Sequence, residues 1–294
     1  MFVIMMENTG FDTLIGNPNA PFTNFLATTS GFARSYFGVT HPSQPNYIAG
    51  TSGSTNGVPN DNDITIDVPN IVDQLESHGK SWKGYMQSFS LCATPLDHAC
   101  GNQLYERKHN PFVSYLDVQS SAARLAKIVD FSQFATDLAN DTVPNYSWIS
   151  PDQCHDMHGR GATPADPCDF SQIPALIQTG DSFLAQTVGA IMASRAWREK
   201  SLIFIVWDES DFTGTGPFGF GDTSGCCDSN PGGGHVVGLV ISNSLPSPRT
   251  SNTSYNHFSM LATIQDVFHL GCLAFTCDKE NVPPMFDLIR HGDQ

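Results

Sequence analysis

Charged side chains are scarce in this sequence of 294 residues, because Asp, Glu, Lys and Arg together make up only 15% of it. Typical soluble domains contain about 25% of these residues. The charges present are mostly acidic, with 29 Asp and Glu against 14 Lys and Arg, and the formal net charge is -15. A field of this sign repels polyanions and so excludes a nucleic-acid-binding surface. A site for a phosphorylated small molecule would need local positive charge.

The sequence also has no apolar run near the ~20 residues that cross a bilayer, so we expect no stable membrane insertion. It has no linker-like stretch or internal repeat, and its hydrophobic content of 40% can supply a substantial core. We therefore expect a single domain over residues 1–294. The first residues have a strand pattern and lack the basic and apolar regions of a signal peptide, so we expect any such peptide to have been removed.

No CxxC spacing occurs among the eight cysteines, which disfavours a metal–thiolate site, including one at Cys226 and Cys227. The even number of cysteines favours structural disulfides, and closeness along the chain suggests the pairs 92/100, 154/168 and 272/277. Such a disulfide framework is typical of proteins from oxidising compartments. We therefore expect a secreted or extracytoplasmic protein.

Buried-strand patterns alternate with helical patterns along the chain, which predicts an α/β fold with a mostly parallel central sheet. We expect strands at residues 2–8, 31–39, 81–86, 146–150, 201–210 and 235–242, and helices at 21–28, 71–78, 130–140, 181–199 and 257–270. A further helix is expected to begin near residue 43, so that residues 31–86 resemble one βαβ unit. Residues 87–122 have little periodicity and are expected to cover the sheet, and a Gly-rich loop spans 213–234.

Three of the predicted strands end in potential metal ligands. Glu7 and Asn8 end the first strand, and Asp208 and Glu209 end the fifth. A third cluster follows residue 150 and contains Asp152, His155, Asp156 and His158. Ligands of open α/β sheets bind beyond the carboxyl ends of the strands, so the first two pairs can meet at one cation. A single acid at such a position is more often a cap, but three clusters together favour a site.

The ligand types restrict the cation without identifying it. Carboxylate and amide oxygens suit Mg, Ca or Mn, whereas added imidazoles admit Zn or Fe.

Ser43 lies between two prolines, where the predicted strand 31–39 leads into a helix. A hydroxyl at a helix N-terminus gains from the helix dipole and from a nearby metal, which favours a role as nucleophile. In that case Asn46 can bind a substrate oxygen. A serine at this position can equally cap the helix, and the local sequence does not separate the two interpretations.

The segments MMENTGFD, THPSQPNYIAG, YERKHNPF, SPDQCHDMH, IVWDES and YNHFSMLATIQD occur in this order over nearly the whole chain. Together they resemble the phosphoesterase family of acid phosphatases and phospholipases C, within the alkaline phosphatase superfamily. The resemblance implies a three-layer sandwich with a central, mostly parallel sheet and helices on both faces.

The resemblance also implies roles for individual residues. A divalent metal would be held by Glu7, Asn8, Asp208 and Glu209, and Ser43 would complete its ligands and attack phosphorus to form a phosphoserine. Substrate oxygens would be bound by Asn8 and Asn46 and by two histidines, which match at His109 and His158, with His155 as a competing choice. Protonated imidazoles would supply the missing positive charge and favour an acidic pH optimum.

Two departures from many members of the superfamily bear on the number of metal ions. Glu7-Asn8 stands where a first-strand Asp is usual, and Asp208-Glu209 stands where an Asp-His pair is usual, so we expect one metal rather than two. A second site from Asp152, His235 and His257 is the alternative. His257 can instead be a buried residue at a helix start, and His235 a loop residue after three glycines.

The function expected from these residues is that of a secreted, metal-dependent phosphoric monoester hydrolase. A phospholipase C that cleaves the ester at a phospholipid headgroup is the alternative, and a non-catalytic extracellular binding protein is less favoured because the nucleophile and ligands are intact. The absence of a CxPxR motif disfavours a sulfatase.

Overall fold

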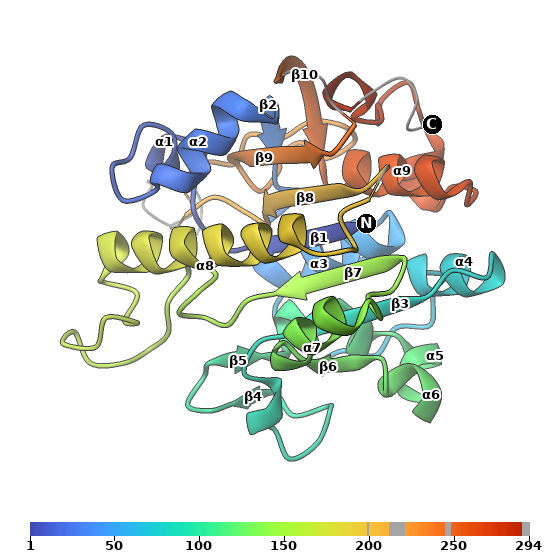
Figure 1. The fold of residues 1–294 in the computed structure, drawn as a ribbon, viewed down its shortest axis with the longest axis horizontal. Helices are drawn as coiled ribbons and strands as arrows, with labels where there is room; N and C mark the ends of the chain where they lie inside the picture. The colour runs from blue at the N-terminus through green and yellow to red at the C-terminus, as the bar shows by residue number, and fades with distance from the viewer. Residues whose placement is uncertain (199, 212–220, 245–247, 290–294) are drawn as a thin grey trace.

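The computed structural model describes residues 1–198, 200–211, 221–244 and 248–289, and its centre is an eight-stranded sheet (Figure 1). The strands lie in the order β10-β2-β9-β8-β1-β7-β3-β6. Their bounds are β1 Phe2–Met6, β2 Gly31–Phe37, β3 Trp82–Met86, β6 Ile128–Asp130, β7 Tyr146–Ser150, β8 Leu202–Trp207, β9 His235–Ser242 and β10 Arg249–Asn256. Within this sheet only β9 runs antiparallel to its neighbours.

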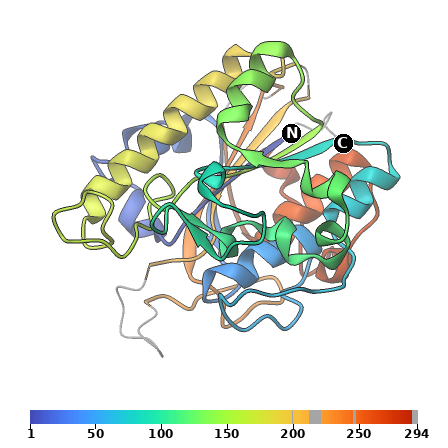
Figure 2. The ribbon, with the colours of Figure 1, turned by 90° about the horizontal axis from the view of Figure 1, so that it is seen from below.

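Helices cover both faces of the sheet (Figure 2). On one face α2 (Pro21–Thr29) and α7 (Ser132–Asn140) contact α8 (Ile173–Ala193), and on the other α3 (Ser43–Ser52) contacts α9 (His257–Phe268). The remaining helices are short: α1 Phe11–Leu14, α4 Ile71–Ser77, α5 Leu116–Gln119 and α6 Ala122–Leu125. This confirms the predicted three-layer α/β sandwich with a mostly parallel sheet.

The two central strands are buried along their whole length. Every residue of β1 and β8 is buried, and Ile4 pairs with Ile205 in a parallel register. Continuous apolar runs are expected here because helices cover both faces of a parallel sheet. Since β1 and β8 run side by side in one direction, their carboxyl ends bring Glu7 and Asp208 to the same edge.

Most predicted elements are present, but three differ from expectation. The polar segment Arg249–Asn256 forms edge strand β10, which was missed because an edge strand paired to β2 needs no apolar run. Helix α8 begins at Ile173 with Pro174 in its first turn, not at Asp181, and it ends at Ala193. Residue 199, the predicted end of that helix, lies outside the described residues. Residues 128–130 form strand β6 ahead of helix α7.

The predicted βαβ unit is not a pair of neighbouring strands. Strands β2 and β3 point the same way, but β9, β8, β1 and β7 lie between them, so the connection crosses most of the sheet. Residues 87–122 form a covering segment with the short strands β4 Ala99–Cys100 and β5 Tyr105–Glu106 and single turns of 3-10 helix, one of which is Arg107–His109. Of the Gly-rich loop 213–234, residues 213–220 lie outside the described ranges.

All three predicted disulfide pairs are present, and the remaining two cysteines, Cys226 and Cys227, are also joined to each other. Their sulfurs are therefore not free to bind a metal. Among the described residues, no helix combines the length and apolarity required to span a membrane. The expectation of one domain over the whole chain stays a prediction.

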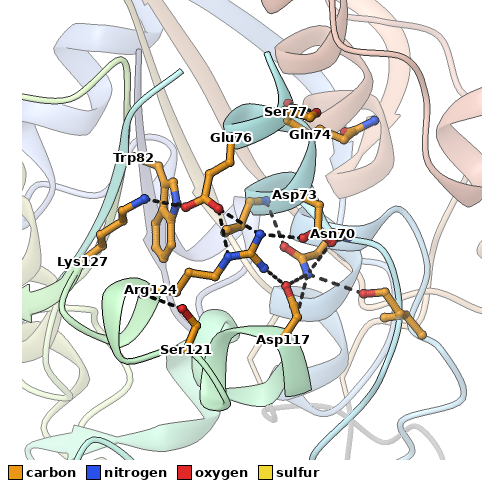
Figure 3. Close-up of polar contacts among 12 residues, drawn as sticks. Asn70, Asp73, Gln74, Glu76, Ser77, Trp82, Asp117, Ser121, Arg124 and Lys127 are labelled. Atoms are coloured by element: carbon orange, nitrogen blue, oxygen red, sulfur yellow. Dashed lines mark hydrogen bonds and ion pairs between the residues drawn. The ribbon is translucent and has the colours of Figure 1, made fainter. Parts of the chain in front are cut away.

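A cluster of charged side chains ties helix α6 to helix α4 and strand β3 (Figure 3). Glu76 of α4 accepts hydrogen bonds from Arg124 and Lys127 and from the indole of Trp82, the last at 2.9 Å. Arg124 also pairs with Asp73 and Asp117. Partial burial raises the pKa of Glu76, but these donors outweigh that effect and lower the pKa to about 2.

We expect this cluster to make stability depend on acid pH. A depressed carboxyl pKa contributes stability above the unfolded value of about 4.3, and this contribution disappears as the pH falls towards the folded value of about 2. Replacing Glu76 with Gln should therefore lower the melting temperature at pH 7 by a few degrees, equivalent to about 1 kcal/mol, and the difference should vanish near pH 2. A pH-independent difference would contradict this. Asp266→Asn, in an exposed pair with Lys279, is the control and should have little effect.

Candidate active site

Ser43 is the first residue of helix α3, which follows strand β2 and is buried throughout. The turn that leads to it is held by Asn46. The side-chain oxygen of Asn46 accepts hydrogen bonds from the amides of Val39 (2.8 Å) and Thr40 (3.1 Å). Its side-chain nitrogen donates to the carbonyls of Thr40 (2.7 Å) and Pro42 (3.1 Å). All these hydrogen bonds are internal, so Asn46 fixes the turn before the serine. Its contact with a substrate oxygen stays a prediction.

The Ser43 hydroxyl points at two carboxylates. Its Oγ lies 3.0 Å from Glu7 Oε2 and 3.0 Å from Glu209 Oε1. The residue before the helix is Pro42, and no side chain caps this helix start. The interpretation of Ser43 as a simple helix cap is therefore not the arrangement seen, since its hydroxyl is directed at acids from the ends of two other strands.

The residues predicted to bind a metal lie together around Ser43. The Asn8 amide donates to Asp208 Oδ1 at 2.9 Å. Buried atoms that accept or donate no hydrogen bond among the described residues include Glu7 Oε1, Asn8 Oδ1, Asp208 Oδ2 and, from residues close by, Asp156 Oδ2 and His109 Nε2. Glu7 Oε1 and His109 Nε2 are 3.0 Å apart but lack hydrogen-bond geometry. Buried polar atoms normally have partners, so this concentration of oxygen and imidazole atoms fits a cation.

The spacing of the acids is wider than that of a closed metal site. Within the described ranges, the one trio of acidic, His or Cys ligands with atoms within 4.8 Å of one another is Cys92, Asp97 and Cys100, and its two cysteines form a disulfide. The Ser43 hydroxyl lies between Glu7 and Glu209. A metal at this edge would thus need Ser43 as well as the carboxylates.

Burial of several acids at one place shifts their protonation. Burial raises the pKa of Glu7 to about 7 and that of Glu209 to about 8. Burial and the charge of Glu7 together raise the pKa values of Asp208 and Asp156 well above their usual range. Four such groups cannot all carry charge without a compensating cation. The electrostatics therefore support the same conclusion as the unpartnered atoms.

His41 belongs to the site although no role was predicted for it. Its Nδ1 is hydrogen-bonded to Glu209 Oε2, and its Nε2 lies 2.9 Å from the carbonyl of Asp222. Burial lowers the pKa of His41, but the adjacent Glu209 outweighs it, so the net shift is upward. His41 thus orients Glu209. The one available signal was its position two residues before Ser43.

The histidines divide into two groups. His109 stacks on Tyr47, with ring centroids 5.3 Å apart, and its ring lies 6.2 Å from that of His158. His155 instead binds Asp152 at 2.6 Å and packs beside Phe183. The structure therefore places His158, and not the competing His155, beside His109.

The surroundings of these two histidines disfavour the expected imidazolium form. Burial and the charge of Lys108 lower the pKa of His109 well below its usual value and that of His158 to about 3. Burial lowers the pKa of Lys108 as well, but the charges of Glu7 and Asp61 outweigh it, so Lys108 stays cationic. Its Nζ donates to Asp61 Oδ2 at 3.1 Å. Lys108 is therefore a positive charge close enough to lower the pKa of both histidines.

The alternative second metal site is not assembled. Asp152 accepts from Ser88 and pairs with His155. His235 stacks on Phe11, and its Nε2 lies 2.8 Å from the Arg34 carbonyl. Asp152 follows β7 and His235 begins β9, and these strands are three positions apart, or about 14 Å.

His257, the third residue of that alternative, is a fully buried residue at the start of α9. Its Nδ1 is 3.0 Å from the Tyr36 hydroxyl and its Nε2 is 2.7 Å from the Asp208 carbonyl. Both ring nitrogens are therefore occupied, and His257 supports the backbone that carries Asp208.

A serine at a helix start faces acids at the carboxyl edge of this sheet. The fold is similar to that of a solved Vibrio parahaemolyticus protein in the alkaline phosphatase superfamily, with a TM-score of 0.61 over 99% of this chain and 71% of that chain, at 13% identity. Residues 17–271 match the sequence model of the Phosphoesterase family, and the chain belongs to that family. The resemblance seen in the motifs is thereby confirmed.

Two curated relatives are similar over nearly the whole chain. A probable acid phosphatase of Kluyveromyces lactis is 26% identical over 92% of this chain and 59% of its own length. The phosphatidylinositol-3-phosphatase of Mycobacterium tuberculosis is 26% identical over 97% of this chain and 81% of its own length. The chain thus spans little more than half of the yeast relative.

We expect divalent cations to stabilise the protein through this site. Titration with Mg²⁺, Ca²⁺, Mn²⁺ or Zn²⁺ to about a hundredfold excess over Kd should raise the melting temperature by about 5 °C for the cation that fits. The effect should be weaker at pH 6 than at pH 8, because the raised pKa values of Glu7 and Glu209 let protons compete. Asp208→Asn should abolish the response and Asp152→Asn should retain it. An equal response in both variants would place the cation elsewhere.

Proposed function

We propose that the protein hydrolyses phosphoric monoesters with Ser43 as nucleophile and one divalent metal ion as cofactor. The observation that carries this proposal is the Ser43 hydroxyl, held 3.0 Å from both Glu7 and Glu209 amid buried, unpartnered ligand atoms. The acid phosphatase and phosphatidylinositol-3-phosphatase among the relatives support it, as does membership of the Phosphoesterase family. Activity of the whole protein is part of this proposal.

The metal would be held by Glu7, Asn8, Asp208 and Glu209 together with Ser43. When bound, such an ion supplies Lewis-acid stabilisation of charge on the phosphoryl oxygens and favours the serine alkoxide. The donor set is mostly oxygen, which suits Mg, Ca or Mn, and the nearby imidazole of His109 keeps Zn and Fe open.

The chain's own residues would act in two displacements. The Ser43 proton passes to Glu7 or Glu209, Ser43 Oγ forms a bond to phosphorus, and the bond from phosphorus to the alcohol oxygen breaks as that oxygen takes up a proton from solvent and leaves as the alcohol. A water molecule then attacks the phosphoserine, which returns inorganic phosphate and the free serine. His41 holds Glu209 in the orientation that reaches the hydroxyl. Asn46 fixes the turn, so that the hydroxyl is positioned before substrate arrives.

A neutral His158 favours the monoanionic form of the substrate. The Nδ1 of His158 lies 2.6 Å from the Gly159 carbonyl and donates to it, so Nε2 is left as an acceptor. The low pKa of His158, about 3, keeps Nε2 unprotonated. A phosphate monoester has a second pKa near 6, so below that pH it carries a proton that His158 can accept as a hydrogen bond. This offers a route to acid phosphatase activity without an imidazolium.

The proposed setting is an extracytoplasmic compartment. Four disulfides use all eight cysteines, and such frameworks persist in oxidising environments. Its substrates would be small phosphorylated molecules or phosphorylated lipid headgroups that reach the site from solution.

We expect Ser43→Ala to reduce kcat for p-nitrophenyl phosphate by about a thousandfold or more, because the covalent route is lost. The melting temperature should change little, since the alanine can occupy the same helix position. Acid quench of the wild-type enzyme with ³²P-labelled substrate should trap label on Ser43. Ser77→Ala, at an exposed position of helix α4, should behave as wild type. Retained turnover in the Ser43→Ala enzyme would overturn the nucleophile assignment and leave a role in metal binding only.

The phospholipase C alternative is separated by comparing p-nitrophenyl phosphate with p-nitrophenyl phosphorylcholine. We expect kcat/KM for the monoester to be at least tenfold higher, because the diester offers the site one non-bridging oxygen fewer than the monoester does. Higher kcat/KM for the choline diester would favour the phospholipase. Cleavage of neither compound by the metal-loaded enzyme would favour the non-catalytic binding protein.

A further inference from the structure

A cleft of about 490 Å³ opens beside the proposed phosphoryl site. Its lining includes Asn8 and His158 of the proposed site and the apolar side chains of Met157, Phe170, Ile173 and Leu176. We propose that this cleft binds the alcohol portion of the substrate and selects monoesters of alkyl or aryl alcohols over those of sugars. This inference rests on the proposed phosphatase function, whose phosphoryl site it extends.

The cleft is continuous with the catalytic cluster. Asn8 follows strand β1, its amide is bonded to Asp208, and its buried side-chain oxygen lacks a partner among the described residues. The ring of His158 lies 6.2 Å from that of His109, which itself approaches Glu7. Asn8 and His158 therefore border both the cleft and the site where phosphorus would be attacked. In a monoester the alcohol carbon is bonded directly to the leaving oxygen, so the alcohol would lie close to these two residues.

Four of the lining residues, Met157, Phe170, Ile173 and Leu176, form an apolar wall of the cleft. Met157 and Leu176 are buried, with 4% and 1% exposed. Phe170 and Ile173 are large apolar side chains with 54% and 44% of their surfaces exposed. Single exposed hydrophobics are common, but two that border a cleft over a buried apolar floor are typical of a binding site.

The chain holds this wall in place. The disulfide between Cys154 and Cys168 joins the two ends of the loop that carries Met157 and His158. Gly159 has a φ of +81°, and a Cβ there would lie 2.7 Å from Leu176 Cδ1. Only glycine therefore permits this close packing. The wall is thus prepared for a ligand before it binds, which reduces the entropy cost of binding.

The polar groups of the cleft do not suit a sugar. Thr9 Oγ1 donates to the Glu7 carbonyl at 3.0 Å, and Thr13 Oγ1 donates to Asp211 Oδ2 at 2.9 Å. Both hydroxyls are thus committed within the protein, and a polyol would bury its own hydroxyls without equivalent partners. The carboxylate of Asp211 also opposes alcohols that carry a second phosphate.

A larger cavity of about 610 Å³ lies between α7 and α8, but it is a poorer candidate. Its lining includes His155 and Phe183, and it contains neither Ser43 nor any of the proposed metal ligands. A ligand there would have no reacting group within reach.

The test measures kcat/KM of the metal-loaded enzyme for methyl, ethyl, butyl and hexyl phosphate, whose alcohols are similar leaving groups. Burial of each methylene contributes about 0.8 kcal/mol, so we expect kcat/KM to rise about two- to fourfold per added carbon until the cleft is filled. Glucose 6-phosphate should rank below butyl phosphate. The variant Phe170→Ser/Ile173→Ser should flatten this series, so that kcat/KM for hexyl phosphate falls towards that for methyl phosphate. Met192→Ser, which alters an equally exposed side chain of α8, should keep the wild-type slope.

Two outcomes overturn the inference while the phosphatase function stands. One is equal kcat/KM across the series in an enzyme that Ser43→Ala inactivates, and the other is a slope that the double variant leaves intact. Binding of alkyl phosphonates by the Ser43→Ala protein gives a readout without turnover. The cleft is supported, even if no ester is hydrolysed, when phosphonates with longer alkyl chains bind this protein more tightly. Adding Phe170→Ser and Ile173→Ser to Ser43→Ala should then remove that dependence on chain length. In that case the proposed function fails and the apolar site remains.

Discussion

Mutual repulsion of buried carboxyl groups is the constraint on which the rest of this structure depends. Glu7 and Asp208 end neighbouring parallel strands, Glu209 follows directly, and Asp156 lies behind His109. Burial raises the pKa of each, so the fold carries a cost that a bound cation would offset. Three surrounding residues hold the carboxyl groups and Ser43 in place. Asn46 fixes the turn before Ser43, His41 is hydrogen-bonded to Glu209, and His257 is hydrogen-bonded to the backbone of Asp208.

Much of the fold could be predicted because parallel strands buried on both faces leave a strong pattern. The runs at β1 and β8 are apolar throughout, and both end in acids. Strand β10 left no such pattern, since its pairing with β2 at the sheet edge is made by the backbone of a polar segment. The predicted start of α8 at Asp181 is wrong, because the helix begins at Ile173. The Asp181 carboxylate lies inside the helix and accepts hydrogen bonds from the amides of Phe22 and Thr23 across the layer.

The candidate site was predictable in its members but not in their division of labour. Ser43 and the four candidate metal ligands follow from strand ends and a helix start, which are local features. Whether His155 or His158 lies beside His109 depends on the conformation of the loop that carries both. Their separation of three residues along the chain does not reveal that conformation. Asn46 and His257 have the residue types of ligands, but the hydrogen-bonding groups of Asn46 are occupied by backbone atoms of the turn. Those of His257 are occupied by the Tyr36 hydroxyl and the Asp208 carbonyl, which only the folded chain brings near.

The separation of the site residues along the chain has a consequence for folding. The hydrogen bond from Asn8 to Asp208 joins residues 200 positions apart, and that from Ser43 to Glu209 joins residues 166 apart. Closing such long loops has an entropy cost that only the nearly complete sheet can offset. During synthesis, a chain that has emerged only as far as β7 holds the serine but only part of its acidic environment. The proposed capacity to attack phosphorus should therefore arise late, together with the central strand pair, so that the candidate active centre itself reports that the sheet has closed.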